Sequence, residues 1–170
     1  IGTKKVIEDH STIGLVITTD GSFSDLPRES YAAVEGRVIQ ELQSIGKPFL
    51  TLVNSVDPHS AAAQQVVQHL QETYGVSAVP VNCASLGESD LRTILTEVLY
   101  EFPIQQIAVA LPRFVSILSA NHPVQSSVYD SLRQAGSAAH TMRDLQAMAQ
   151  ALCENEWIDD ARIANMDLGT

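Results

Sequence analysis

The chain has few cysteines, few aromatic residues and no basic cluster. Of its 170 residues, 2 are cysteine and 5% are aromatic, and 10 Lys and Arg stand against 20 Asp and Glu, for a net charge of −10. Without a patch of Lys and Arg, a nucleic-acid-binding groove is not expected. Cys83 and Cys153 form neither a CxxC motif nor an even-numbered disulfide framework, a pattern that favours a reducing compartment.

Long hydrophobic stretches are also missing. The longest apolar run, residues 13–17, is far too short to cross a bilayer, and no charged segment followed by an apolar one marks a secretory leader. The chain begins with Ile1 rather than Met, so we expect it to be a piece of a longer protein. With 45% hydrophobic and 18% charged residues, it can build one domain with a sizeable core.

A phosphate-binding loop is the third absence. The pattern GxxxxGK followed by Ser or Thr does not occur, and the only lysines are Lys4, Lys5 and Lys47, none of them in a glycine-rich loop. The residues that cradle nucleotide phosphates in P-loop proteins are therefore not in this sequence.

What the chain does contain is an alternation of short apolar runs and helix-like segments. The runs cover residues 13–18, 49–53, 76–81 and 107–111, and apolar residues at helical spacing fill 27–45, 60–74, 89–102 and 124–153. Near-continuous apolar strands that alternate with helices are typical of buried parallel strands, which right-handed crossovers connect. We therefore predict an α/β fold in three layers with a mainly parallel sheet.

Residues that favour helix ends support these segments. Asp25 is predicted to cap the start of the first helix, and Ser60 and Ser89 the starts of the next two, because each side chain can accept a hydrogen bond from a first-turn N–H. Gly46 and Gly75 are predicted to end the first two helices, since glycine adopts the left-handed conformation that closes many helices.

Polar or small residues follow each of the first three runs. They are Thr18, Thr19 and Asp20 after the first run, Asn54, Ser55 and Asp57 after the second, and Cys83 and Ala84 after the third. In parallel α/β sheets ligands bind beyond the carboxyl ends of the strands, so we expect these residues to share one rim of the sheet. Each stretch taken alone is also ordinary turn chemistry.

Taken together, the strand ends resemble the second half of the GTPase-type P-loop NTPase fold. In that class one strand ends in an Asp-containing loop, the next in Asn-Lys-x-Asp and a third in Ser-Ala-Lys. Asn54-Ser55-Val56-Asp57 matches the second signature with Ser in place of Lys, and Cys83-Ala84-Ser85 matches the third loosely. The resemblance implies that Asn54, Ser55 and Asp57 border a nucleotide base, and that Cys83 and Ala84 lie at its far edge.

The same resemblance places Thr18 and Thr19 on the phosphate side, where a hydroxyl can sense a γ-phosphate or position water. The alternative is that both are ordinary strand residues whose hydroxyls bond to the backbone. The identity of the base stays open: Asp57 favours guanine, whose ring N–H and exocyclic amine suit a carboxylate, whereas Ser55 lacks the lysine stem that covers the base.

A more specific resemblance covers most of the chain. The segments DHSTIGLVITTDGSFSDLPRESY, IGKPFLTLVNS, LYEFP and LPRFVSIL with NHP, in that order, resemble the stage IV sporulation protein A family of spore coat morphogenetic ATPases. The resemblance implies that residues 1–103 are the rear half of a GTPase-like ATPase domain. It implies that residues 104–170 begin a middle domain, with a strand and a long helix. ATP and Mg²⁺ are the implied cofactors of the full-length protein, and none is expected in this piece.

The resemblance also implies a role and partners. The role is an ATP-hydrolysing, self-polymerising scaffold that forms the basement layer of the spore coat, in the mother-cell cytoplasm at the outer forespore membrane. The partners are further copies of the same protein, a small amphipathic membrane-anchoring protein and other coat proteins. Two other functions stay open. Asp57 supports a GTP-dependent switch, and the missing phosphate loop supports a non-catalytic interaction module. The piece alone is expected to be inactive toward nucleotide.

A structural consequence follows from the GTPase-type strand order. In that order the phosphate-loop strand lies beside the strand that ends at Thr18. Without it, we expect residues 13–18 to form an open apolar edge of the sheet, or an edge that another chain fills.

Overall fold

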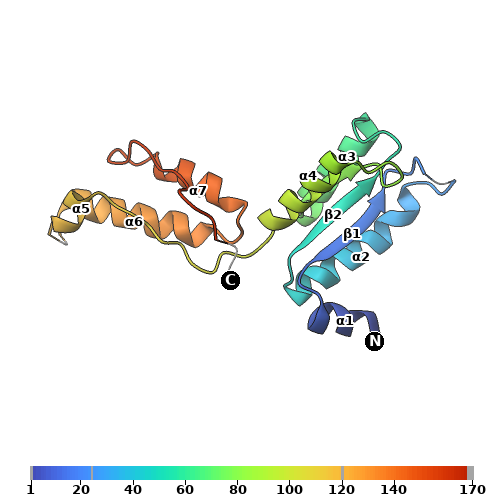
Figure 1. The fold of residues 1–170 in the computed structure, drawn as a ribbon, viewed down its shortest axis with the longest axis horizontal. Coiled ribbons are helices and arrows are strands. Elements are labelled where there is room, and N and C mark those ends of the chain that lie inside the picture. Colours follow the sequence, from blue (N-terminus) through green and yellow to red (C-terminus); the bar gives the residue numbers. More distant parts are fainter. Residues whose placement is uncertain (1, 24, 120, 168–170) are drawn as a thin grey trace. The chain divides into compact units, whose positions relative to one another are not determined.

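The computed structural model describes residues 2–23, 25–119 and 121–167, and it divides the chain into a first unit that ends at Glu101 and a second that begins at Phe102. The first unit contains a sheet of three parallel strands in the order β1 (Gly14–Thr19), β2 (Phe49–Asn54) and β3 (Ala78–Val81). β1 and β2 lie side by side in Figure 1. Gly14 is opposite Phe49, and Asn54 is opposite Val81. Parallel neighbours need crossover connections, and α2 (Glu29–Ile45) and α3 (Ala61–Tyr74) supply them.

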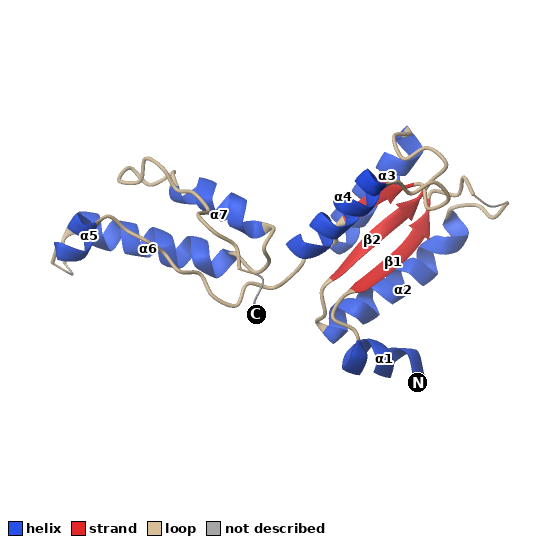
Figure 2. Cartoon of the chain, in the orientation of Figure 1, coloured by secondary structure: helices blue, strands red, loops and turns tan. Residues whose placement is uncertain are grey.

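Helices cover both faces of this sheet. α2 and α3 pack on one face, and α4 (Glu88–Tyr100) packs against β2 on the other (Figure 2), while α1 (Gly2–His10) precedes β1. The larger core lies under α2 and α3, and its most enclosed members include Ile39, Val53 and Leu70. The predicted α/β fold with a parallel sheet between helical layers is confirmed.

Helix ends agree with the sequence in part. Ser60 Oγ accepts a hydrogen bond from Ala63 N at 3.2 Å, which confirms the predicted cap of α3. Gly46 and Gly75 close α2 and α3 with φ of 72° and 64°, values that glycine adopts without the steric cost that a Cβ brings.

Two predicted caps are wrong. α2 begins at Glu29, after a turn in which Ser30 N donates to Pro27 O, and this turn leaves Asp25 too far upstream to cap the helix. α4 begins at Glu88, so Ser89 lies inside its first turn. A carboxylate takes the capping role there, since Gly87 N donates to Asp90 Oδ2 at 2.8 Å.

The second unit contains α5 (Arg113–Ile117), α6 (Pro123–Ala138) and α7 (Asp144–Leu152). α6 and α7 pack together, with Val128 and Leu152 buried. Asn155, which follows α7, ties it back to α6 because its Nδ2 donates to Ser127 Oγ at 2.9 Å and Ser131 Oγ at 2.7 Å.

The strand predicted over residues 107–111 is wrong. These residues have no partner strand within the described part of this unit, and Val109 is half exposed. A strand needs a neighbour for its N–H and C=O groups, so an apolar run alone does not make one.

The long helix predicted over residues 124–153 is also wrong, because the structure has two helices there, and a non-helical segment separates Ala138 from Asp144. His140 O accepts from Ile104 N at 2.9 Å and Met142 N donates to Phe102 O at 3.0 Å, so these backbone groups bond to the preceding segment instead of a helix. The Asp144 carboxylate then accepts from His140 N and Thr141 N, both at 2.8 Å, and starts α7.

No helix within the described ranges combines the length and the hydrophobicity that crossing a bilayer requires.

The edge of β1 is open, as the sequence predicted. Within the described residues β1 pairs with β2 and with no other strand. Leu15 and Ile17, next to Leu50 and Leu52 in the register, keep 52% and 64% of their surface exposed, whereas the two β2 leucines are buried. α4 therefore covers β2 and leaves β1 bare on this face.

We expect this bare edge to make the isolated chain self-associate, and a charge to suppress it. Ile17→Lys should reduce aggregation, because charged side chains on an edge strand oppose pairing with another chain. Light scattering against concentration measures the effect. Ile117→Lys is the matched control, since Ile117 is 80% exposed on α5, a helix of the second unit. Equal suppression by both variants would mean that added charge, and not the β1 edge, is responsible.

Candidate functional site

The three strand ends meet at one rim of the sheet. Asp20 N, just beyond β1, donates to Asn54 O at 3.3 Å, and Ser55 N, just beyond β2, donates to Val81 O at 2.9 Å. The parallel register therefore continues into the loops, and it brings the polar residues after β1, β2 and β3 together.

Asn54 joins the second loop to the third. Its Oδ1 accepts a hydrogen bond from Cys83 N at 2.9 Å. Within the described part of the chain, no hydrogen bond uses Asn54 Nδ2, and the residue is half-buried at the rim. The amide nitrogen of Asn54 is thus a donor that remains available for a ligand at this edge of the sheet.

Ser55 does not face a ligand. It is 0% exposed, and its hydroxyl oxygen lies 2.6 Å from Asp20 Oδ2, 3.1 Å from Asp57 N and 2.9 Å from Asp57 O. The side chain predicted to border the base is therefore used inside the protein, where it connects the loops after β1 and β2.

Asp20 is the acidic group at the centre of this rim. Burial raises the pKa of its carboxyl, but hydrogen bonds from the Ser22 and Ser55 side chains and from the Ser22 backbone outweigh it, and the net pKa is lower than the usual 3.8. Ser22 N and Ser22 Oγ both donate to Asp20 Oδ1, at 2.9 and 2.6 Å. Because donors surround it, the carboxylate stays ionised at neutral pH.

Asp57 is exposed, and one of its two carboxylate oxygens accepts a hydrogen bond. Its Oδ1 accepts from His59 N at 3.0 Å, a local turn that leads into α3. Its Oδ2 takes part in no hydrogen bond among the described residues. One carboxylate oxygen of Asp57 and the amide nitrogen of Asn54 are therefore two polar groups at the rim that no hydrogen bond uses among the described residues.

The Cys83-Ala84 turn offers less than the sequence predicted. Cys83 N already donates to Asn54 Oδ1, and Ala84 N donates to Asn82 Oδ1 at 3.0 Å. Both N–H groups expected at the far edge of a base are thus satisfied within the chain. The turn supports Asn54 and leaves the Cys83 thiol partly exposed beside it.

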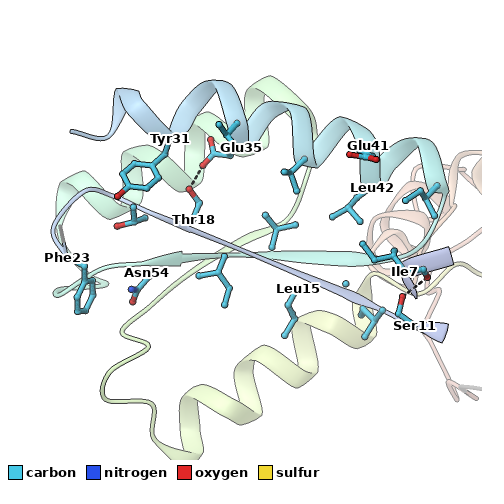
Figure 3. Close-up of a pocket in the computed structure, with 18 residues that line it drawn as sticks. Ile7, Ser11, Leu15, Thr18, Phe23, Tyr31, Glu35, Glu41, Leu42 and Asn54 are labelled. Carbon is cyan, nitrogen blue, oxygen red and sulfur yellow. Dashed lines mark hydrogen bonds between the residues drawn. The ribbon is translucent and has the colours of Figure 1, made fainter. Parts of the chain in front are cut away.

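Thr18 and Thr19 lie on opposite faces of β1. The Thr18 hydroxyl donates to Glu35 Oε2 on the face that α2 covers, so it turns away from Asn54 (Figure 3). The Thr19 hydroxyl accepts from Gly21 N at 3.0 Å and shapes the turn after the strand. Both threonines are buried. Thr19 bonds to the backbone, as in the alternative to phosphate sensing, whereas Thr18 bonds to a carboxylate side chain.

A buried ion pair next to Thr18 was not predicted. Arg28 Nη2 lies 2.7 Å from Glu35 Oε1, and the two side chains are 18% and 3% exposed. Arg28 Nη1 is buried with no hydrogen-bond partner. The sequence signal was weak, since a Glu inside an amphipathic helix normally faces water. The pair lies within the first turns of α2, and the bond from the Thr18 hydroxyl to Glu35 joins these turns to the end of β1.

A groove of about 770 Å³ runs along the open edge of β1 (Figure 3). Its walls come mainly from β1, α2 and α1, with Asn54 from the end of β2, and they include Leu15, Val34, Val38 and Glu35. Val34 and Val38 are 57% and 37% exposed. A groove lined mainly by aliphatic side chains beside an unpaired strand suits polypeptide better than a polar small molecule.

We expect the buried pair to contribute strongly to stability. Glu35→Ala should lower the free energy of unfolding by about 3 kcal/mol, because it leaves the Arg28 guanidinium buried without its counter-charge. Urea denaturation measures the change. Glu88→Ala is the control: Glu88 pairs with Arg92 at the surface, where both side chains are over three-quarters exposed, so its loss should cost less than about 1 kcal/mol. Similar losses for the two variants would contradict this assignment.

Asp20 should make stability depend on acid pH. Its pKa in the folded state is lower than in the unfolded state, so the ionised carboxylate stabilises the fold above the unfolded pKa, and this stabilisation is lost as pH falls through the folded pKa. The difference in unfolding free energy between the wild type and Asp20→Asn should therefore be constant from pH 7 to about pH 5 and shrink below about pH 4. A difference that does not change on acidification would be inconsistent with an ionised Asp20.

Two family models match the chain. Residues 1–103 match the model described as stage IV sporulation protein A, ATPase domain, and residues 104–170 match stage IV sporulation protein A, middle domain. The structure divides the chain between Glu101 and Phe102, two residues before the boundary between the models. No solved structure matches the chain.

Curated relatives agree with the models. Stage IV sporulation protein A from Clostridioides difficile and from Bacillus subtilis are each 40% identical to this chain over 169 residues, and that from Bacillus anthracis is 37% identical. Each similarity covers 99% of the chain and 34% of the relative, so the chain spans about a third of their length. Because the two family models together match residues 1–103 and 104–170, the chain belongs to the stage IV sporulation protein A family.

Proposed function

We propose that this chain is part of an ATP-hydrolysing, self-polymerising scaffold of the spore coat, and that its first unit supplies the base side of the nucleotide site. The observation that carries the proposal is the rim where Asn54 and Asp57 keep an amide nitrogen and a carboxylate oxygen unused. Family membership supports it, since the model that matches residues 1–103 is described as an ATPase domain.

The chemistry divides between this chain and residues outside it. Hydrolysis of a phosphoanhydride by water needs groups that position the phosphates and neutralise their charge, with Mg²⁺ among them. Residues 1–170 contain no phosphate loop, and no three His, Cys, Asp or Glu side chains within the described ranges are placed to hold a metal ion. The chain's own part is therefore to bind and orient the base, through Asn54 Nδ2 and Asp57 Oδ2.

A GTP-dependent switch is the second candidate, and Asp57 favours it. A carboxylate oxygen accepts from the ring N–H and exocyclic amine of guanine, whereas adenine offers an amine but no matching ring N–H. Ser55 argues the other way, because its buried hydroxyl leaves the loop without a stem to cover the base. We place ATP first because the family is described by an ATPase domain.

The proposal also includes partners and a location, which we infer from membership of the family. The partners are further copies of the protein, a small amphipathic membrane-anchoring protein and other coat proteins, and the place is the mother-cell side of the forespore membrane. The third candidate, a non-catalytic interaction module, would keep the same fold and leave the rim empty.

Nucleotide competition in the full-length protein tests the proposal. ATP should displace a fluorescent nucleotide better than GTP does, and Asp57→Ala should lower nucleotide affinity about tenfold, the effect of removing one good charge-assisted contact. Asp159→Ala, a change of the same kind at an exposed position beyond α7, is the control and should have no effect.

The competing outcomes are distinct. A preference for GTP that Asp57→Ala abolishes would replace the ATPase proposal with the switch. Absence of binding by the full-length protein would leave the interaction module. Hydrolysis by residues 1–170 alone would show that the catalytic groups were misplaced.

A further inference from the structure

The Asp20 carboxylate is linked, through two serine hydroxyls, to two successive backbone N–H groups of the loop after β2. Val56 N donates to Ser22 Oγ at 2.9 Å, and Ser22 Oγ donates to Asp20 Oδ1 at 2.6 Å. Asp57 N donates to Ser55 Oγ at 3.1 Å, and Ser55 Oγ lies 2.6 Å from Asp20 Oδ2. Each oxygen of Asp20 therefore holds one N–H of this loop through one hydroxyl.

The Ser55 proton goes to Asp20. Ser55 Oγ has one hydrogen and two candidate acceptors, Asp20 Oδ2 at 2.6 Å and Asp57 O at 2.9 Å. A charged acceptor at the shorter distance forms the stronger bond. Because the Ser55 hydroxyl donates its hydrogen bond to Asp20, the Ser55 oxygen can accept from Asp57 N. These two hydrogen bonds connect the Asp20 carboxylate to the Asp57 backbone.

The other contacts of this loop hold groups other than these two N–H groups. Val56 is 55% exposed, so apolar packing contributes little there. Asn82 Nδ2 donates to Val56 O at 3.1 Å, Ser55 N donates to Val81 O at 2.9 Å, and Gln64 Nε2 donates to Pro58 O at 3.0 Å. Among the described residues, the N–H groups of Val56 and Asp57 bond to the hydroxyls of Ser22 and Ser55 and to no other acceptor. In the GTPase-type signature a lysine occupies the position of Ser55. A lysine side chain would not fit this fully enclosed site, so the position here serves to anchor the loop from beneath.

We propose that Asp20, acting through Ser22 and Ser55, is the positioning residue of the base-reading loop, residues 54–58. It holds the Asp57 carboxylate next to Asn54 so that both meet one edge of the nucleotide base. The inference rests on the proposed function, because it assigns a task to the same rim. It adds a role for Asp20, Ser22 and Ser55, which hold the loop without touching the ligand, with Ser55 at the position of the lysine in the GTPase signature.

The test uses the full-length protein with Asp20→Asn, Ser55→Ala and Ser22→Ala. Each variant should raise KM for the nucleotide, about tenfold for the first two and about threefold for Ser22→Ala, while kcat stays within about twofold, as expected when binding and not chemistry is weakened. Ser22 is exposed, so we expect Ser22→Ala to fold, and this variant keeps the test valid if Ser55→Ala does not fold.

A second measurement does not depend on activity. Amide hydrogen exchange without nucleotide should rise at Val56 and Asp57 in these variants, because their N–H groups lose the hydroxyl acceptors. Asp144→Asn is the matched control. Asp144 likewise accepts hydrogen bonds from two backbone N–H groups and a hydroxyl, but it lies in the second unit. It should change neither exchange in residues 54–58 nor KM.

The outcomes separate the two ideas. Faster exchange with raised KM supports the assignment of Asp20. Unchanged exchange at Val56 and Asp57 overturns it, whatever the kinetics show. Faster exchange with unchanged KM in an active protein overturns the positioning role while the proposed function stands. A wild-type protein that binds no nucleotide overturns both, and the unmodified protein alone reveals this.

Discussion

Parallel pairing of β1, β2 and β3 is the constraint on which the rest of the structure depends. It directs all three carboxyl ends to one rim, and the register places Thr19 opposite Asn54 and Asn54 opposite Val81. The loops that follow must then satisfy their polar groups against one another. Asn54 does so for the third loop and Asp20 for the second. The rim is therefore a single hydrogen-bonded unit, although its residues are far apart in the sequence.

The sheet could be predicted because its signals are local. The runs 49–53 and 76–81 are apolar enough to be buried strands, and Gly46 and Gly75 end their helices for a reason that each glycine carries alone. The second unit could not be predicted in the same way. An apolar stripe over residues 124–153 fits one helix, but backbone bonds from residues 102–104 and the Asp144 carboxylate interrupt it. The bonds to residues 102–104 are distant contacts that periodicity does not record. Asp144 acts within the segment, where it caps the start of α7.

The candidate site divides along the same line. The parallel order of the strands predicted that the residues after β1, β2 and β3 share one rim, but it did not predict where each side chain points. Thr18 faces Glu35 because its side chain lies on the face of β1 that α2 covers. Successive side chains of a strand point to opposite faces, so Thr19 and its register partner Asn54 lie on the other face. Ser55 is the clearest case: the motif suggested a ligand contact, and the structure shows a fully enclosed hydroxyl that Asp20 requires. Asn54 Nδ2 and Asp57 Oδ2 take part in no hydrogen bond among the described residues and can meet a ligand.

The central claim is that this rim faces the base of a nucleotide. Photolabelling of the full-length protein with 8-azido-ATP, followed by peptide mapping, tests it most directly. The account predicts that label appears in peptides containing residues 54–58 or 82–85 and that unlabelled ATP removes it. Label that ATP displaces but that maps only outside these residues would contradict the account.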